Sequence, residues 1–177
     1  MGRKPTITRD DLLRIAEDIV NTEGAQALTI GTLAKAAGIS KGGVQYSFLS
    51  KDDLIKGLVD RWITHFDSLV VDIESVGPIN FVRSYISAMR SAQGAIDAKM
   101  AGLMIAYMQN SENRMETADW YRSILGKMGD TPDARVARTA FMATEGLFML
   151  RILGADDGVD WQSQLDDIEA LLTAHPA

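Results

Sequence analysis

The chain of 177 residues contains no cysteine, only four prolines and only two histidines. Without cysteine, disulfides and thiolate metal sites are excluded, which suits a reducing compartment. His65 and His175 are isolated from carboxylates at ligand spacing, so we expect neither a metal nor another cofactor. Charges or glycines interrupt every apolar stretch well short of the roughly 20 residues that span a bilayer. We therefore expect a cytoplasmic protein without a membrane partner.

Patterns typical of catalysis are also missing. The sequence has no Ser-His-Asp set, no paired carboxylates at metal spacing and no glycine loop with a phosphate-binding fingerprint. An enzyme is therefore not expected. Hydrophobic residues make up 46% and charged residues 24%, as in ordinary globular proteins. No segment alternates in the manner of a strand, so the chain predicts an all-α fold.

Helical patterns with clear boundaries fill the first 48 residues. Thr8 begins a helix with a capping-box pattern, and Gly24 ends it. Residues 29–48 then contain two short helices joined by a tight turn, the first between Thr29 and Gly38 and the second beginning at Ser40. This arrangement is a helix-turn-helix, whose second helix enters the major groove of DNA.

The second helix has one narrow apolar seam, formed by Val44 and Phe48, and its other residues are small or polar. Such a helix packs by one side and leaves the other free for a polyanion. Gly42 and Gly43 are poor helix formers. Two explanations stay open: a close approach of the backbone to DNA, or a small penalty because both glycines lie in the first turn.

The net charge of −6 is unexpected for a DNA-binding protein, but it is unevenly distributed. Residues 1–61 carry nine Lys or Arg and eight Asp or Glu, so the excess of acid lies in residues 62–177. We expect repulsion to keep that part away from DNA and binding to weaken steeply with salt. Arg3, Lys4 and Arg9 suit a basic arm before the first helix that reaches phosphates or the minor groove; a solvated, disordered segment is the alternative.

Residues 7 to about 60 resemble the DNA-binding head of the TetR family of bacterial transcriptional regulators. The resemblance rests on Leu28-Thr29-Ile30, Leu33-Ala34, Ala37 to Gly42, Tyr46, Phe48, Ser50-Lys51 and Leu54. It implies an N-terminal three-helix DNA-binding head at residues 1–50 and a helical regulatory and dimerisation domain at 51–177. It also implies double-stranded DNA, with a palindromic operator, as the partner of a homodimer.

The resemblance further implies which residues contact DNA. Thr29 and Lys51 correspond to positions that often hold phosphates, and the segment from Ser40 to Ser47 corresponds to the reading helix. Gln45, Ser47 and Leu49 depart from the residues common in the family. Because Gln can pair bidentately with adenine, Gln45 is the first candidate for reading a base. The predicted DNA-binding residues are Thr29, Ser40, Lys41, Gly42, Gly43, Gln45, Tyr46, Ser47 and Lys51.

Residues 51–177 are predicted to be helical throughout. The first helix runs from Lys51 to about Glu74, and others follow from Gly77-Pro78 to 93, over 95–109, over 114–128 and from Pro132 to 154. The helix after Pro132 is apolar around almost its full circumference, so a second subunit is expected to cover one side; a monomeric bundle is the alternative. The predicted dimer residues are Val136, Ala140, Leu147, Trp161, Leu165, Ile168 and Leu172.

Methionine and aromatic residues on the middle helices suggest a pocket for a small hydrophobic effector, although stripes of Met are also common in plain cores. Glu145 interrupts the apolar helix; either it faces a cationic ligand or it pairs with Arg135, Arg138 or Arg151, and pairing is favoured. The predicted pocket residues are Trp62, Phe66, Tyr85, Met89, Met100, Met104, Tyr107, Met108, Trp120, Met142, Glu145 and Met149.

The sequence thus predicts a homodimeric repressor that a small ligand releases from DNA. The resemblance to the TetR family supplies most of this prediction. Two alternatives remain at this point: a regulator or activator that needs no ligand, and a helical scaffold whose head binds protein.

Overall fold

The computed structural model describes residues 7–92, 98–155 and 158–173, except for the side chains of 92 and 98–100. The described part is helical and contains no strand, which confirms the all-α prediction. Its elements are α1 (Arg9–Glu23), the 3₁₀ turn η1 (Ala25–Ala27), α2 (Ile30–Ala37), α3 (Lys41–Gln45), α4 (Lys51–Asp67), α5 (Ile73–Ala92), α6 (Ala98–Gln109), α7 (Ser111–Met128), α8 (Pro132–Ile152) and α9 (Trp161–Thr173).

Side-chain caps fix where the head helices begin, as the sequence predicts. The hydroxyls of Thr8, Thr29, Ser40 and Ser50 each accept a hydrogen bond of 3.0–3.1 Å from a backbone N–H three residues ahead. Each cap of this kind stabilises a helix by about 0.5–2 kcal/mol. The starts of α1, α2, α3 and α4 are therefore determined locally.

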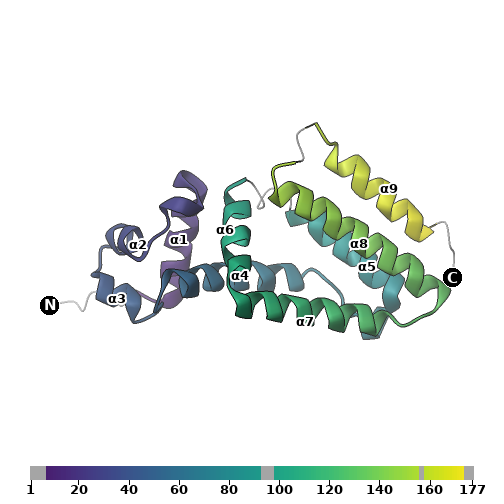
Figure 1. Ribbon diagram of the computed structural model, residues 1–177, viewed down its shortest axis with the longest axis horizontal. Coiled ribbons are helices and arrows are strands. Elements are labelled where there is room, and N and C mark those ends of the chain that lie inside the picture. The colour runs from purple at the N-terminus through teal and green to yellow at the C-terminus, as the bar shows by residue number, and fades with distance from the viewer. Residues whose placement is uncertain (1–6, 93–97, 156–157, 174–177) are drawn as a thin grey trace.

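A first hydrophobic core holds α1, α2 and α3 around the first half of α4 (Figure 1). Leu12, Leu33 and Val44 are fully buried in it, and Leu54 of α4 joins them. Two residues of α6, Leu103 and Tyr107, also belong to this core. The packed unit therefore extends past the boundary at residue 50 that the sequence predicts.

The prediction of one helix from Lys51 to about Glu74 is wrong at its C-terminal end. α4 ends at Asp67, and the next residues form turns in which Leu69 N–H bonds to Phe66 O at 2.9 Å. The Val71 N–H then donates to Ser84 Oγ of α5 at 3.1 Å. Ile73 is buried in the body core and belongs to α5, not to α4.

Gly77 separates the first turn of α5 from its main part. Its φ of 77° lies in the left-handed region, and the regular helix resumes at Pro78, where the sequence predicts a helix start. α7 begins at Ser111, earlier than predicted, because the Asn110 side chain accepts from the N–H groups of Glu112 and Asn113. Pro132 stands in the first turn of α8 behind the Thr131 cap, as predicted.

The body forms a second hydrophobic core, in which α5, α8 and α9 pack against one another (Figure 1). α7 runs along one side of the body, and α6 stands across the junction with the head. None of the described helices is long and apolar enough to cross a membrane.

Four of the predicted dimer residues are buried within their own subunit and are not exposed to a second one. Ala140, Leu165, Ile168 and Leu172 are buried inside the subunit, because the inner sides of α8 and α9 pack on the body core. Val136, Leu147 and Trp161 are half-buried against the same core. The apolar side chains that α8 leaves exposed are instead Met142, Met149, Leu150 and, just after its end, Leu153.

Candidate DNA interface and a buried acidic site

A left-handed glycine makes the turn between α2 and α3. Gly38 has a φ of 67°, and the following Ile39 N–H bonds to Ala34 O at 3.1 Å. Val44 and Phe48 are fully buried, as predicted, but α3 ends at Gln45, so Phe48 lies in the turn after the helix and not on it. α3 therefore packs against the rest of the head core by one side only.

The other side of α3 faces solvent. Lys41, Gly42, Gly43 and Gln45 are exposed, and Ser47 is half-buried. Tyr46 is 95% exposed, so its ring is free to contact another molecule. Leu49, which departs from the residues common in the family that the head resembles, is 82% exposed beside this surface.

The two glycines of α3 have different surroundings. A Cβ at Gly43 would lie 3.3 Å from Ile39 Cδ1, so packing against the turn favours glycine there. A Cβ at Gly42 would meet only Ser40 Oγ, at 3.8 Å, and no packing reason for glycine exists. Packing within the chain therefore does not explain the glycine at position 42.

Thr29 and Lys51 lie at the starts of α2 and α4. The Thr29 hydroxyl caps its own helix, and the residue is exposed. Lys51 is half-buried in the first turn of α4. Free N–H groups and the positive end of the helix dipole make such starts suitable for phosphate.

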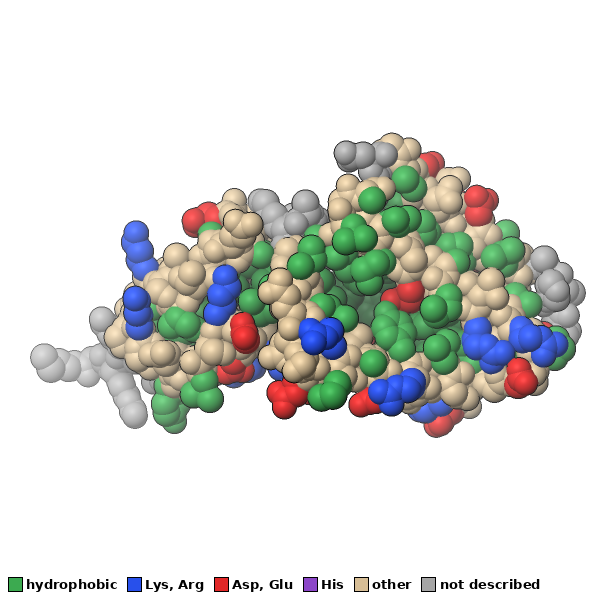
Figure 2. Space-filling view, in the orientation of Figure 1, with side chains coloured by type: hydrophobic (Ala, Val, Ile, Leu, Met, Phe, Trp, Pro, Cys, Tyr) green, Lys and Arg blue, Asp and Glu red, His purple; other side chains and the backbone are tan. Residues whose placement is uncertain are grey.

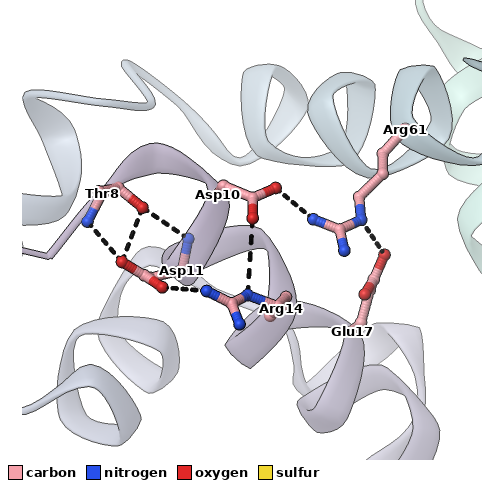
Figure 3. A network of polar contacts seen from close by, with 6 residues as sticks. All are labelled: Thr8, Asp10, Asp11, Arg14, Glu17 and Arg61. Atoms are coloured by element: carbon pink, nitrogen blue, oxygen red, sulfur yellow. Dashed lines mark hydrogen bonds and ion pairs between the residues drawn. The ribbon is translucent and has the colours of Figure 1, made fainter.

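An ion-pair network joins α1 to α4 (Figure 3). The Arg61 guanidinium of α4 pairs with Asp10 and, at 3.1 Å from Nε to Oε1, with Glu17 of α1. Burial raises the pKa of Glu17, although Arg61 opposes this. Exposed pairs of this kind contribute only about 0–1 kcal/mol each.

Arg9, predicted as part of a basic arm, also has a role within the fold. Its guanidinium lies 4.6 Å from the centre of the Phe48 ring. Arg3 and Lys4 lie outside the described residues.

A second link joins α4 to the body. Lys56 Nζ lies 2.5 Å from Glu116 Oε2 of α7, and this hydrogen bond raises the pKa of Lys56. α4 is thus tied to the head by Arg61 and to α7 by Lys56. If α1 moves relative to α4, the Arg61 ion pairs must stretch or break. If α7 moves relative to α4, the Lys56–Glu116 pair must stretch or break.

In the body, Glu145 of α8 is buried with its carboxylate held by two tyrosines. The hydroxyl of Tyr85 donates to Oε1, and that of Tyr121 donates to Oε2. Burial raises the pKa of Glu145, and the two hydrogen bonds oppose that rise. Burial and the nearby carboxylate raise the pKa values of both tyrosines, so they remain hydroxyl donors.

This arrangement overturns the favoured interpretation of Glu145. Arg138 instead pairs with Asp130 and with the Gly129 carbonyl, and Arg135 donates to the Asp130 carbonyl. The Arg151 guanidinium lies 5.3 Å from the Trp161 ring centre. Within the described residues, Glu145 forms no ion pair.

Aromatic rings surround the two tyrosines. Trp62 lies 5.4 Å from Phe66 and 6.1 Å from Phe148 between ring centres. The Tyr85 ring lies 5.0 Å from those of Phe66 and Phe141. We call this group the aromatic cluster; its members are Trp62, Phe66, Phe81, Tyr85, Trp120, Tyr121, Phe141 and Phe148.

The structure brings only some of the predicted pocket residues together. Trp62, Phe66, Tyr85, Trp120 and Glu145 meet in or beside the aromatic cluster, and Met89 is buried in the same core. The prediction missed Tyr121 and Phe141. Tyr121 follows Trp120 directly, but its partner lies 24 residues away, and no local pattern reveals that contact.

The remaining predicted pocket residues lie elsewhere. Met142 and Met149 are 54% and 47% exposed on the outer side of α8, so they are not pocket residues within this subunit. Tyr107 and Met108 pack on the head core, while Met104 contacts both cores. The side chain of Met100 lies outside the described residues.

Figure 2 shows hydrophobic side chains gathered between α6 and α8, where the surface is hollowed. α7 and α8, which carry Trp120 and Glu145, border this region. The described residues include no group of three metal-ligating side chains.

Comparisons with known proteins support this architecture. Residues 12–58 match the model of bacterial regulatory proteins of the tetR family, and residues 80–173 match the tetracyclin repressor-like C-terminal domain. No curated protein in the comparison matches the chain.

Solved structures share the fold at 16% identity. They include a single-residue variant of TetR from Acinetobacter baumannii AYE in complex with minocycline (TM-score 0.61, covering 94% of this chain and 95% of that one). A possible TetR family regulator from Streptomyces coelicolor A3(2) gives 0.58, with 94% and 98% covered. A TetR regulator from Legionella pneumophila gives 0.59, with 98% of both chains covered. Because one family model alone spans more than half of the sequence, the chain belongs to the TetR family and is a DNA-binding transcriptional regulator, not an enzyme.

Proposed function

We propose that the protein is a homodimeric repressor in the bacterial cytoplasm, that it binds a palindromic operator, and that a small hydrophobic ligand releases it. The observation that carries this proposal is the position of α4. Its first half belongs to the head core, and its second half carries Trp62 and Phe66 into the aromatic cluster. A ligand that displaces the Trp62 and Phe66 rings would move α4, and the head packs on the first half of α4.

The exposed side of α3 supports DNA reading. Gln45 offers an amide of the kind that pairs bidentately with adenine, Tyr46 is free, and Lys41 supplies positive charge. The starts of α2 and α4 supply N–H groups for phosphate on either side of the reading helix in the sequence. The division into a head at 1–50 and a body at 51–177 remains part of this proposal, with α4 shared between both cores.

The exposed apolar residues of α8 support a homodimer. Met142, Met149, Leu150 and Leu153 are each more than 40% exposed, and Leu171 of α9 is equally accessible. A second copy related by a two-fold axis would bury them and would place two reading helices on one duplex. The related A. baumannii structure is a minocycline complex, and this supports a ligand site within the shared fold.

Selection of bound duplexes from random DNA at controlled salt tests the DNA part. We expect an inverted repeat with half-sites one helical turn apart, about 34–36 Å, or a multiple of it. Affinity should fall steeply as salt rises. The Gln45→Ala variant should lose preference at one position of each half-site, by about 1–3 kcal/mol. An unrepeated site, or no enrichment of any DNA, would contradict the proposal.

A reporter with the selected operator across its promoter tests repression. Expression should fall when the protein is present and recover when a releasing ligand is added. Coupling between ligand and DNA is expected at about 1–3 kcal/mol, a change of about 5–150-fold in affinity. Increased expression would identify an activator, and operator affinity unchanged at saturating ligand would identify a regulator without ligand release.

A further inference from the structure

Glu145 places a carboxyl group inside the aromatic cluster, and we propose that the effector of this regulator is a hydrophobic organic cation bound there. The inference rests on the proposed ligand release and specifies its chemistry. The ligand class is an ammonium, or another delocalised cation, that carries an aryl or alkyl body.

The charge of Glu145 has no basic partner among the described residues. The neighbouring arginines of α8 are used elsewhere: Arg135 and Arg138 at the turn before the helix, and Arg151 beside Trp161. Asp67 of α4 adds a second negative charge that acts on Tyr85. A buried charge without a counterion is unfavourable, so a cation entering this region gains an interaction that the free protein lacks.

The hydrogen bonds to Glu145 favour its charged, accepting form and oppose the rise in pKa that burial causes. Tyr85 and Tyr121 each donate to one of its oxygens, and each oxygen keeps a further lone pair for a ligand. The donors come from α5 and α7, so the carboxylate is fixed from two sides. This arrangement orients an acceptor, and it offers an anionic ligand only repulsion.

The rings around the carboxylate suit a cation as well as an apolar body. Trp62 and Phe148 are stacked with an angle of 2° between their planes, and Trp120 lies 6.4 Å from Tyr85. Faces of Trp and Tyr attract cations, whereas their area accommodates the hydrophobic part of a ligand. Phe141 is fully buried, while Trp120 of α7 is 36% exposed at the edge of the aromatic cluster.

The test compares probes of equal shape and different charge on the full-length, DNA-free protein. Phenyltrimethylammonium is paired with its neutral carbon analogue tert-butylbenzene, and tetraphenylphosphonium with the anion tetraphenylborate. Titration calorimetry gives the affinities, and quenching of Trp62 and Trp120 fluorescence locates the binding. We expect at least one cation to bind ten-fold or more tightly than its partner.

Glu145→Gln keeps the shape of the side chain and removes its charge. It should reduce binding of the cation ten-fold or more and leave the neutral probe within two-fold. The matched control is Glu112→Gln at the exposed start of α7, which should change neither. Circular dichroism establishes that each variant is folded.

Tyr121→Phe tests whether Glu145 acts on the ligand through its charge or only supports the packing of α7. It removes one hydrogen bond and keeps the carboxylate, so the preference for cations should persist. Loss of that preference equal to the loss in Glu145→Gln would indicate that Glu145 only holds α7 in place, and this would overturn the inference. Equal affinity for the cation and its neutral analogue, or no binding of either cation, would also overturn it.

Operator release distinguishes this inference from the proposed function. If neutral apolar compounds release DNA while cations neither bind nor release it, the function stands and the cation inference fails. If cations bind with the Glu145 dependence given above but leave the operator affinity unchanged, the site stands and ligand release fails.

Discussion

At the residue scale, Glu145 has a protonation equilibrium that differs between the folded and unfolded chain. Burial raises its pKa in the folded protein above the usual value of 4.5. The folded state therefore holds this proton more tightly than the unfolded state, and the contribution of Glu145 to stability is greatest below the usual carboxyl range. Stability is lost as the pH rises through the raised pKa.

We predict that Glu145→Gln removes the loss of folding stability that Glu145 causes as the pH rises. The free energy of unfolding of the variant, relative to the natural protein, should increase from pH 4.5 upward, as measured by denaturant titration across a pH series. Glu112→Gln serves as the surface control. A difference that stays constant with pH would show that Glu145 is solvated like an ordinary surface carboxylate.

Gly42 allows the two explanations of the glycine-rich start of α3 to be tested separately. Its surroundings leave space for a methyl group, so Gly42→Ala should stabilise the head by up to about 1 kcal/mol. If the backbone approaches DNA closely, the same change should weaken operator binding. Melting temperature and operator affinity are the two measurements, and stabilisation with unchanged affinity would exclude a close approach.

Residue-level predictions succeeded where the cause is local. The caps at Thr8, Thr29 and Ser40 depend on residues three positions apart, and all of them form. The partners of Glu145 lie 60 and 24 residues away, so the sequence favoured the adjacent arginines, and that interpretation was wrong.

At the element scale, α4 connects the two cores and shows the limit of periodicity. Apolar spacing continues from Phe66 through Val70 to Ile73, and this led to the prediction of one long helix. The chain turns after Asp67, and Ile73 belongs to α5. A helical period can therefore persist across a turn when both sides face the same core.

The Lys56–Glu116 link is predicted to transmit ligand binding from α7 to α4. Glu116→Gln should change stability by no more than about 1 kcal/mol, because both side chains are partly exposed. It should reduce the coupling between effector and operator, measured as the ratio of operator affinities with and without ligand. Asp119→Asn, which removes an exposed pair within α7, is the control. Equal coupling in both variants would exclude this route.

At the scale of the whole molecule, the exposed apolar residues of α8 are the reason for expecting a homodimer. Leu150→Glu should convert the dimer into monomers, since it places a charge in the surface that the second copy would cover. Sedimentation velocity measures the change. Met115→Glu, at another exposed apolar residue on α7, should leave the dimer intact. A monomer before any substitution would contradict the proposed assembly.

The sequence by itself determined the helical class, the starts of the head helices, the burial of Val44 and Phe48 and the resemblance to TetR regulators. These depend on interactions within a few residues. Only the tertiary structure decided that α4 ends at Asp67, that Ala140 and Leu165 face their own subunit, and that Glu145 meets two tyrosines among aromatic rings. The reason is physical: the side of a helix that becomes core, and the partner of a buried charge, depend on helices that are distant in the chain.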